Sequence, residues 1–482
     1  MMIYYACSKP ECRYFMFDNS TICAASTPPG QGGIAVIRVS GVDAFTACGK
    51  IFRPAKKTAF PLESRGRGST LLFGHVFRGE EIIDEVLASV FHAPRSFTGE
   101  NTIEISCHGS TYIQQEILKL LLANGCRMAT SGEFTQRAFL NGKLDLSQAE
   151  AVGDIIAASS AASHRIAMQQ MRGGFSHELA GLRDKLLHFT SLVELELDFG
   201  DEDVEFADRK QLKDLAMQIA EVIRRLVDSF GTGNAIKNGI PVAIVGETNV
   251  GKSTLLNRLL RDDKAIVSDI HGTTRDAIED TVTIDGLLFR FIDTAGIRET
   301  HDTVEKLGME RTFRKIEQAS VVLWVIDLTT DPKESEQLAR QIISRKDEKK
   351  LILVLNKADK LPDEERTEKI SGFTGFNEEY IAISAKSDTG IDALERKLVE
   401  VANIPQIGEN DTIVTNLRHY EALNNALSAG ERVIKGLDSG ISGDFLSQDI
   451  RECLFHLGTI TGQEISTDEV LGNIFRRFCI GK

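Results

Sequence analysis

The sequence predicts a multidomain chain of mixed α/β and α class, in which an α+β domain precedes an all-α domain that is interrupted by a doubly wound α/β domain. Three observations support this prediction. First, 482 residues suffice for about three domains. Second, short apolar runs separated by turn residues give way to Ala, Leu, Ile and Met at helical spacing. Third, strand and helix patterns then alternate before helical periodicity returns.

Composition limits the class of protein. Hydrophobic residues make up 42% and charged residues 26% of the chain, which excludes a largely disordered or collagen-like protein. The net charge of -14 excludes a protein that coats DNA through a dominant basic surface. The eight cysteines form no C-x-x-C pair, which indicates a reducing compartment. With no apolar run near ~20 residues and no secretory signal, we expect a cytoplasmic protein without a membrane span.

Changes of pattern set the domain boundaries. Strands are expected in TICAAS, GIAVIRVSG, LASVFHA and NTIEISCHG, followed by a helix near residues 112–123. The segment GTGNAIKNG, residues 231–239, is expected to be a linker. The expected divisions are an N-terminal extension at 1–20, the α+β domain at 21–140, the two halves of the all-α domain at 141–238 and 404–482, and the α/β domain at 239–403.

A phosphate-binding loop is predicted at the start of the α/β domain. The segment GETNVGKS, residues 246–253, fits G-x-x-x-x-G-K-S and lies between the strand pattern VAIV and the helical pattern TLLNRLL. Glycines let backbone N–H groups close around phosphates, and Lys252 neutralises the β- and γ-phosphate oxygens. The Ser253 hydroxyl would ligate Mg²⁺. This context predicts a P-loop nucleotide site.

Three further motifs follow in the order that a GTPase requires. Residues 293–296, DTAG, end a strand where the γ-phosphate is sensed. In NKAD, residues 356–359, the Asp359 carboxylate accepts hydrogen bonds from guanine N1 and N2, which adenine does not offer together. SAK, residues 384–386, then closes on the guanine edge. The α/β domain is therefore predicted to be a Ras-like GTPase domain.

The switch region raises the question of how the attacking water is oriented. Residues 272–276, GTTRD, are a candidate switch I in which Thr274 gives Mg²⁺ a second hydroxyl. Ile297 stands where Ras-like proteins carry the glutamine that orients the water. On the residues alone, Glu299, Asp302 and Glu305 are candidates for this role, and the alternative is that they are solvated loop charges.

The sequence resembles the MnmE (TrmE) family of tRNA-modifying GTPases over residues 21–482. It lacks the proline common in that family's P-loop, and HGS replaces the more usual HGG. The motifs that carry the resemblance, besides those of the GTPase domain, are TPPGQGGIAVIRVSG (27–41), SFTGENTIEISCHG (96–109), GEFTQRAFLNGKLDLSQAEA (132–151), DIHGTTRD (269–276) and FCIGK (478–482).

The resemblance implies a homodimer formed through folate-binding N-terminal domains, a discontinuous helical domain, and inserted GTPase domains that dimerise when K⁺ binds. It also assigns Glu305 as the catalytic glutamate that orients the water. The implied K⁺ ligands are Asn249, Ser268 (where threonine is common), Ile270 and Thr273. Motifs and resemblance together give these GTP-contacting residues: Asn249, Val250, Gly251, Lys252, Ser253, Thr254, Ser268, Asp269, Ile270, His271, Gly272, Thr273, Thr274, Asp293, Thr294, Ala295, Gly296, Asn356, Lys357, Ala358, Asp359, Ser384, Ala385 and Lys386.

The resemblance further implies a site for a tetrahydrofolate derivative, either the 5-formyl or the 5,10-methylene form. The matching positions are Arg38, Glu104, Lys143 and Lys482, and Cys479 becomes a functional thiol in the modification reaction. Without the resemblance, Arg38 and Glu104 would be interpreted as surface charges on strands.

The implied activity is the addition of an aminomethyl or carboxymethylaminomethyl group to C5 of the wobble uridine of certain tRNAs. The chain carries no dinucleotide fingerprint of its own, so FAD and NADH are expected on a flavoprotein partner of the MnmG (GidA) type, in a heterotetramer or larger complex. The alternative is a ribosome-assembly or signalling switch with the same GTPase motifs. A folate-dependent transferase that works alone lacks the necessary redox cofactor site.

Overall fold

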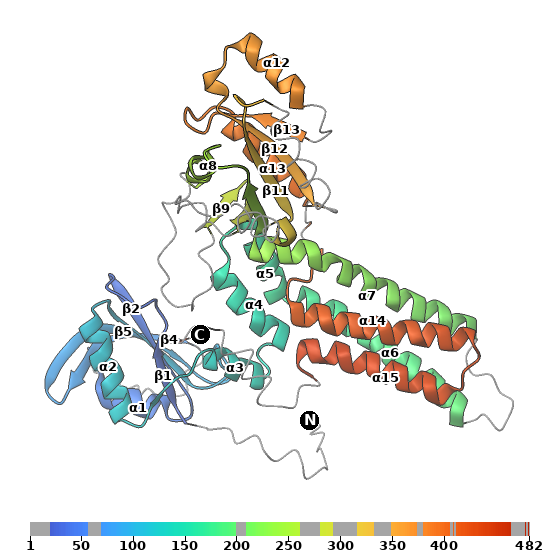
Figure 1. Cartoon of the computed structure of the whole chain (residues 1–482). Helices are drawn as coiled ribbons and strands as arrows, with labels where there is room; N and C mark the ends of the chain where they lie inside the picture. The colour runs from blue at the N-terminus through green and yellow to red at the C-terminus, as the bar shows by residue number, and fades with distance from the viewer. Residues whose placement is uncertain are drawn as a thin grey trace. The chain divides into compact units, whose positions relative to one another are not determined.

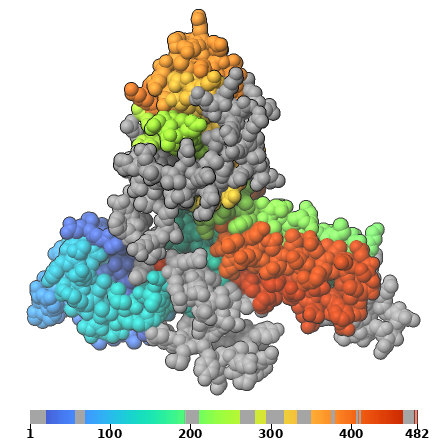
Figure 2. All heavy atoms as spheres, viewed as in Figure 1, coloured from blue at the N-terminus to red at the C-terminus, as the bar shows by residue number. Residues whose placement is uncertain are grey.

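The computed structural model describes residues 20–55, 69–198, 209–260, 280–292, 316–331, 349–373, 379–404, 408, 411–463, 478 and 481; the other residues are grey in Figure 1 and Figure 2. Contacts divide the chain into two compact units. The first comprises residues 1–156, 170–219 and 428–482, and the second comprises residues 157–169 and 220–427. Among the described helices, none is both long and apolar enough to span a membrane.

The N-terminal part of the first unit is an α+β fold (blue to cyan in Figure 1). Its elements are β1 (Ile22–Ala25), β2 (Ile34–Ser40), α1 (Ala44–Ile51), β3 (Phe52–Pro54), β4 (Thr70–Arg78), β5 (Glu81–Phe91), β6 (Thr102–His108), α2 (Thr111–Ala123), β7 (Arg127–Met128) and α3 (Glu133–Leu140).

These strands form a seven-stranded sheet in the order β3-β4-β5-β6-β2-β1-β7. Residues alternate between the two faces, and one face packs against α1 and α2 through a core that includes Ile37, Ile105 and Leu121. The four strands expected from the sequence are β1, β2, β5 and β6, and the expected helix is α2. The sequence interpretation missed α1, β3, β4, β7 and α3. In β4, the consecutive Leu71, Leu72 and Phe73 obscure the strand alternation.

A buried ionic network joins α3 to the sheet. Arg137 is 6% exposed and lies 3.0 Å from the Glu133 carboxylate and 3.1 Å from that of Glu100. Arg127 lies 2.6 Å from Glu133. Burial raises the pKa of the Glu133 carboxyl, but its hydrogen bonds with Arg127 and the Thr130 amide outweigh this effect, and the pKa lies below its usual value.

We expect Arg137→Met to destabilise this fold by about 2–3 kcal/mol, because it removes the cation paired with Glu100 and leaves Glu133 with Arg127 alone. Hydrogen–deuterium exchange of the β2 and β6 amides measures this unit separately from the rest of the chain. Arg95→Met is the matched control, since Arg95 is exposed. Equal protection in the two variants would show that the network contributes little to stability.

Long helices complete the first unit and extend into the second. They are α4 (Leu146–Ala157), α5 (Ala161–Met171), α6 (Gly174–Asp198), α7 (Arg209–Asn238), α14 (Leu417–Asp438) and α15 (Gly443–Thr461).

Helices from the two halves of the sequence pack together within the first unit. Helix α15 contacts α6. Helices α6, α7, α14 and α15 lie side by side (Figure 1). Lys213 of α7 forms an ion pair with Asp438 of α14, and Arg432 of α14 pairs with Asp449 and Glu452 of α15. The all-α fold is thus built from two segments that are separated in sequence by the α/β fold.

The predicted linker at residues 231–239 is wrong for most of its length, because α7 continues as a helix to Asn238. Gly233 serves close packing instead of flexibility, whereas Gly231 faces open space. A Cβ atom on Gly233 would lie 2.2 Å from the carbonyl oxygen of Val414, so only glycine permits this approach. Phe230 of the same helix stacks on Tyr420 with ring centroids 4.4 Å apart.

The second unit contains the α/β fold. Its elements are β8 (Ile240–Val245), α8 (Lys252–Leu259), β9 (Asp280–Ile284), β10 (Leu287–Phe291), β11 (Val321–Asp327), β12 (Lys350–Asn356), the 3₁₀ helix η3 (Ala358–Lys360), α12 (Asp363–Phe373), β13 (Glu379–Ala382) and α13 (Ile391–Ala402).

The described strands form a six-stranded sheet in the order β13-β12-β11-β8-β10-β9, with β9 antiparallel to β10 and the other pairs parallel. Residues 321–326 of β11 are buried on both faces, as a central parallel strand requires. Helices α8 and α13 cover one face, and α12 covers the other. The prediction of a doubly wound sheet is therefore confirmed, and its ligand crevice is expected at the carboxyl ends of β8 and β11.

Candidate functional site

The loop between β8 and α8 has the backbone of a phosphate cradle. Gly246 has φ +149° and Gly251 has φ +102°. A Cβ atom would lie 2.2 Å from Val325 O at Gly246, and 2.3 Å from Asn356 Nδ2 at Gly251. Both positions therefore require glycine.

Side chains of this loop favour an anion. Lys252 Nζ donates hydrogen bonds to Gly246 O at 2.9 Å and Glu247 O at 2.5 Å, which holds the ammonium group against the loop. Ser253 lies in the first turn of α8, where helix amides favour negative charge. Val250 is buried, whereas Asn249, with φ +62°, and Thr254 are exposed. A glycine loop, an ammonium group and a helix N-terminus together fit a phosphate chain.

The carboxyl end of β12 joins this loop to the loop after β13. Asn356 is 3% exposed; its Nδ2 donates to Val250 O at 2.8 Å, and its Oδ1 accepts from the Ala385 amide at 3.0 Å. Ser384 Oγ lies 2.6 Å from Asp359 Oδ1 and holds that carboxylate in place. The structure therefore brings the predicted phosphate and guanine motifs, from three separate segments, to one edge of the sheet.

Lys357 and Asp327 add an ion pair at this edge. Lys357 has φ +67°, and its Nζ lies 2.6 Å from Asp327 Oδ2. Burial raises the pKa of Asp327, but hydrogen bonds from Lys357 and Thr329 outweigh this effect and bring the pKa below its usual value. The sequence interpretation missed Asp327, although its place at the end of a parallel strand was a usable signal.

Arg258 was also missed. It lies in α8 and donates hydrogen bonds to the backbone of residues 385 and 386. Nothing in the pattern LLNRLL distinguishes this arginine from an ordinary solvent-facing helix residue.

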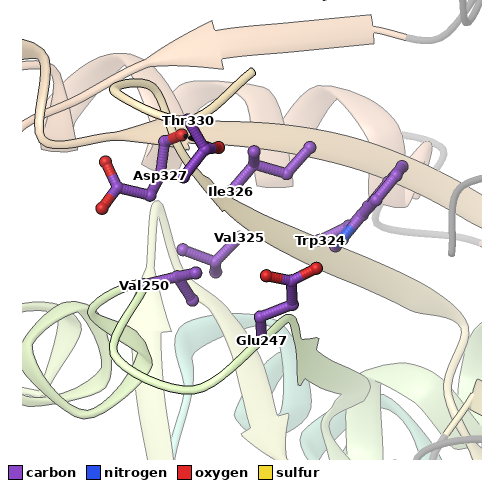
Figure 3. A pocket seen from close by; sticks show the side chains of 7 residues that line it. All are labelled: Glu247, Val250, Trp324, Val325, Ile326, Asp327 and Thr330. Atoms are coloured by element: carbon purple, nitrogen blue, oxygen red, sulfur yellow. Dashed lines mark hydrogen bonds between the residues drawn. The ribbon is translucent and has the colours of Figure 1, made fainter. Parts of the chain in front are cut away.

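A small pocket lies between the P-loop and β11 (Figure 3). Glu247 and Val250 face Trp324, Val325 and Asp327 across it. Its cavity volume is about 10 Å³, close to the ~10–15 Å³ that a single water molecule needs. The pocket is therefore too small to enclose a nucleotide, and it places the chain's single tryptophan close to the P-loop.

Several predicted site residues lie outside the described residues. They are Ser268, Asp269, Ile270, His271, Gly272, Thr273 and Thr274 of the first switch segment; Asp293, Thr294, Ala295, Gly296, Ile297, Glu299, Asp302 and Glu305 of the second; and Cys479 and Lys482 near the C-terminus.

A second polar site lies on the N-terminal sheet. Arg38 of β2 and Glu104 of β6 are cross-strand partners, with the Arg38 guanidinium 2.8 Å from Glu104 Oε1. Their side chains are only 13% and 27% exposed, so the interpretation as surface charges is wrong. The guanidinium also lies 5.2 Å from the Phe97 ring centroid and 5.4 Å from that of Phe134. Aromatic rings and a carboxylate beside a fixed cation form a surface suited to a flat heterocycle.

Gly481 lies against this second site. The Gly481 carbonyl accepts hydrogen bonds from Ser26 Oγ at 3.0 Å and from Arg38 Nη1 at 3.5 Å. A Cβ atom on Gly481 would lie 2.2 Å from Ala25 O, so this contact requires glycine. Lys143 is exposed, and its Nζ donates to Pro94 O at 3.1 Å. Pro94 and Phe97 are three residues apart, so Lys143 borders the same loop.

Comparisons with known proteins agree with these features. The model described as "MnmE helical domain" matches residues 146–479, and that described as "GTP-binding protein TrmE N-terminus" matches residues 21–143. The chain is 60% identical over 468 residues to the tRNA modification GTPase MnmE of Bacteroides thetaiotaomicron, covering 96% of this chain and 100% of that protein. The chain is also 54% identical over 476 residues to the tRNA modification GTPase MnmE of Christiangramia forsetii, covering 96% of this chain and 99% of that protein.

Solved structures also match part of the chain. Era of Aquifex aeolicus bound to GDP and aluminium fluoride is 29% identical, covering 39% of this chain and 66% of that chain with a TM-score of 0.28. A TM-score this low supports no conclusion about function.

Proposed function

The chain belongs to the MnmE family of tRNA modification GTPases, and from this premise we propose that it couples GTP hydrolysis to one-carbon chemistry on the wobble uridine of certain tRNAs. The product is a uridine with an aminomethyl or carboxymethylaminomethyl group at C5. The observation that carries the proposal is the convergence of Lys252, Asn356 and Asp359 at one sheet edge of a chain similar to these enzymes along its length.

In this proposal the P-loop and the guanine motifs bind GTP. Lys252 neutralises phosphate charge, and the Ser253 hydroxyl, with that of Thr274, would hold Mg²⁺. Asp359 accepts the guanine N1 and N2 hydrogens, and Ser384 keeps its carboxylate in place. Residues 268–274 and 293–296, which are outside the described residues, are proposed to complete the phosphate site.

We further propose that K⁺ stimulates hydrolysis when two GTPase domains dimerise. Asn249, Ser268, Ile270 and Thr273 would supply its oxygen ligands. The proposal draws on the family resemblance and on Asn249, which is exposed in the P-loop. Glu305 would orient the attacking water, the role that Ile297 does not perform.

We expect GTP hydrolysis by the full chain to be at least about tenfold faster in KCl than in NaCl at equal ionic strength, because a cation in the dimer interface neutralises transition-state charge. Glu305→Ala should lose this stimulation, whereas Glu299→Ala and Asp302→Ala, its neighbouring candidates, should retain it. The measurement is steady-state phosphate release. Equal rates in both salts would eliminate the K⁺ site and favour the alternative of a GTPase switch.

The second polar site is proposed to bind a tetrahydrofolate derivative, 5-formyl or 5,10-methylene. Glu104 would accept hydrogen bonds from the N–H edge of the pterin, and Arg38 and Lys143 would add positive charge toward the glutamate tail. Lys482 is proposed to reach the same site, since Gly481 already lies against Arg38. Cys479, two residues before Gly481, is proposed as a thiol of the modification reaction.

A homodimer is proposed to form through the N-terminal sheets. Leu71, Phe73 and Leu87 are 63%, 52% and 42% exposed on one face of β4 and β5. Phe73 and Leu87 are cross-strand partners. Ser89, on the same face, pairs with both Leu71 and Glu104, so a second copy seated here would lie beside the folate site.

The redox step requires a partner. We propose a flavoprotein of the MnmG (GidA) type that carries FAD and NADH and joins this chain and tRNA in a heterotetramer or larger complex in the cytoplasm. The competing function, a ribosome-assembly or signalling switch, gives no role to the polar site at Arg38 and Glu104. Folate binding by the full chain therefore separates the two functions.

A further inference from the structure

Arg258 connects helix α8 to the loop after β13, residues 384–388, which we call the guanine loop. It lies in the last turn of α8, and its side chain is 23% exposed. Its Nε donates to Ala385 O and its Nη2 to Lys386 O, both at 3.1 Å, while Nη1 lies 3.5 Å from Asp388 Oδ2. A planar guanidinium that grips two consecutive carbonyls fixes the orientation of both peptides, which a flexible ammonium does less well.

These contacts leave the Lys386 amide of the guanine loop available to a ligand. Because each peptide is planar and trans, the N–H that follows a carbonyl points away from it. Asn356 Oδ1 accepts from the Ala385 amide, and Ser384 Oγ accepts from the Ser387 amide. Within the part of the chain that the structure describes, the Lys386 amide has no hydrogen-bond partner. Arg258 therefore turns the Lys386 N–H away from α8 with its hydrogen-bonding capacity unused.

We propose that Arg258 is a positioning residue for purine selection, which holds the Lys386 amide where it donates to O6 of guanine. This inference rests on the proposed guanine site at Asp359 and deepens it. Adenine carries an amino donor where guanine carries O6, so a fixed N–H donor at this place rejects ATP. Helix α8 then serves both ends of the nucleotide site. Lys252 at its first residue belongs to the phosphate site, and Arg258 in its last turn holds the guanine loop.

The test uses the full chain and measures dissociation constants and release rates for fluorescently labelled GTP and ITP, together with kcat. ITP keeps O6 but lacks the N2 amino group, so the Arg258 contribution should be equal for the two nucleotides. We expect Arg258→Met to raise the dissociation constants of GTP and ITP by about tenfold, because both nucleotides are released faster. The kcat at saturating GTP should stay within about twofold of the wild-type value. Arg258→Lys should recover part of the loss. The matched control is Arg396→Met, an exposed arginine of α13 that donates to Asp392 O in its own helix.

Asp359→Asn separates failure of this inference from failure of the proposed guanine site. If Asp359→Asn weakens GTP binding and Arg258→Met does not, the guanine site stands and the role of Arg258 is overturned. If neither variant weakens GTP binding, the guanine site itself is overturned. A loss of kcat with unchanged affinities would also contradict a positioning role. If circular dichroism shows that Arg258→Met does not fold, the test uses Arg258→Lys instead. A GTP release rate in Arg258→Lys equal to that of the wild type would overturn the inference.

Discussion

Asp359→Asn is expected to lower kcat/KM for GTP by about a thousandfold and to create activity with XTP. The carboxylate accepts from guanine N1–H and the N2 amino group together, whereas an amide presents its own N–H₂ toward that amino group. Xanthine carries an oxygen at C2, so the amide of Asn donates where the carboxylate repels. The measurement is steady-state hydrolysis of GTP and XTP by the full chain.

Asn is the informative replacement because it retains an oxygen that accepts the 2.6 Å hydrogen bond from Ser384 Oγ. The loop is therefore expected to keep its conformation. Asp392→Asn, on an exposed residue in the first turn of α13, is the matched control and should leave both substrates unchanged. A variant that loses GTP hydrolysis without gaining XTP hydrolysis would indicate that Asp359 supports the loop and does not read the base.

The sequence predicted the α/β fold and its site edge well, because each motif stands at a fixed place on a strand or helix. The apolar runs VAIV, VVLWVI and LILVL are strands β8, β11 and β12, and the chemistry follows each carboxyl end. Parallel strands place those ends at the same edge of the sheet, so order along the chain is enough to bring the motifs together.

Side-chain contacts between distant segments could not be predicted in this way. Arg258 reaches Ala385 across more than a hundred residues of sequence, and no local pattern distinguishes it from other helix arginines. The same limit produced the wrong linker at residues 231–239. Clustered glycines usually indicate a turn or loop. Gly233 instead lies inside α7, where Val414 O approaches too closely for a side chain.

Arg38 and Glu104 show a third case, in which the residues were found only through family resemblance. Charged residues that alternate with apolar ones on strands normally face solvent, which favoured an interpretation as surface charges. Here α3 and the loop that bears Phe97 cover part of that sheet face, and Phe134 packs near the guanidinium. Burial of a strand's second face depends on elements far along the chain, which strand periodicity does not report.

Glu104→Gln is expected to weaken the binding of 5-formyltetrahydrofolate to the full chain by about ten- to a hundredfold, because it removes a charged acceptor from the proposed pterin site. Glutamine keeps an oxygen that accepts from Arg38, which lies 2.8 Å from Glu104 Oε1, so the sheet should remain intact. GTP hydrolysis should be unchanged, whereas tRNA modification with the flavoprotein partner should be lost. Binding is measured by calorimetry.

Glu85→Gln provides the matched control, since Glu85 is a 62% exposed carboxylate of the same sheet whose Oε1 lies 3.4 Å from His75 Nε2. If both variants bind folate like the wild type, Arg38 and Glu104 form a structural ion pair and the pterin lies elsewhere. If the wild type itself does not bind folate, the result favours a GTPase switch, because a switch requires only the nucleotide-binding site. Folate binding that depends on Glu104 and not on Glu85 would instead tie the N-terminal fold to one-carbon chemistry, which a switch does not perform.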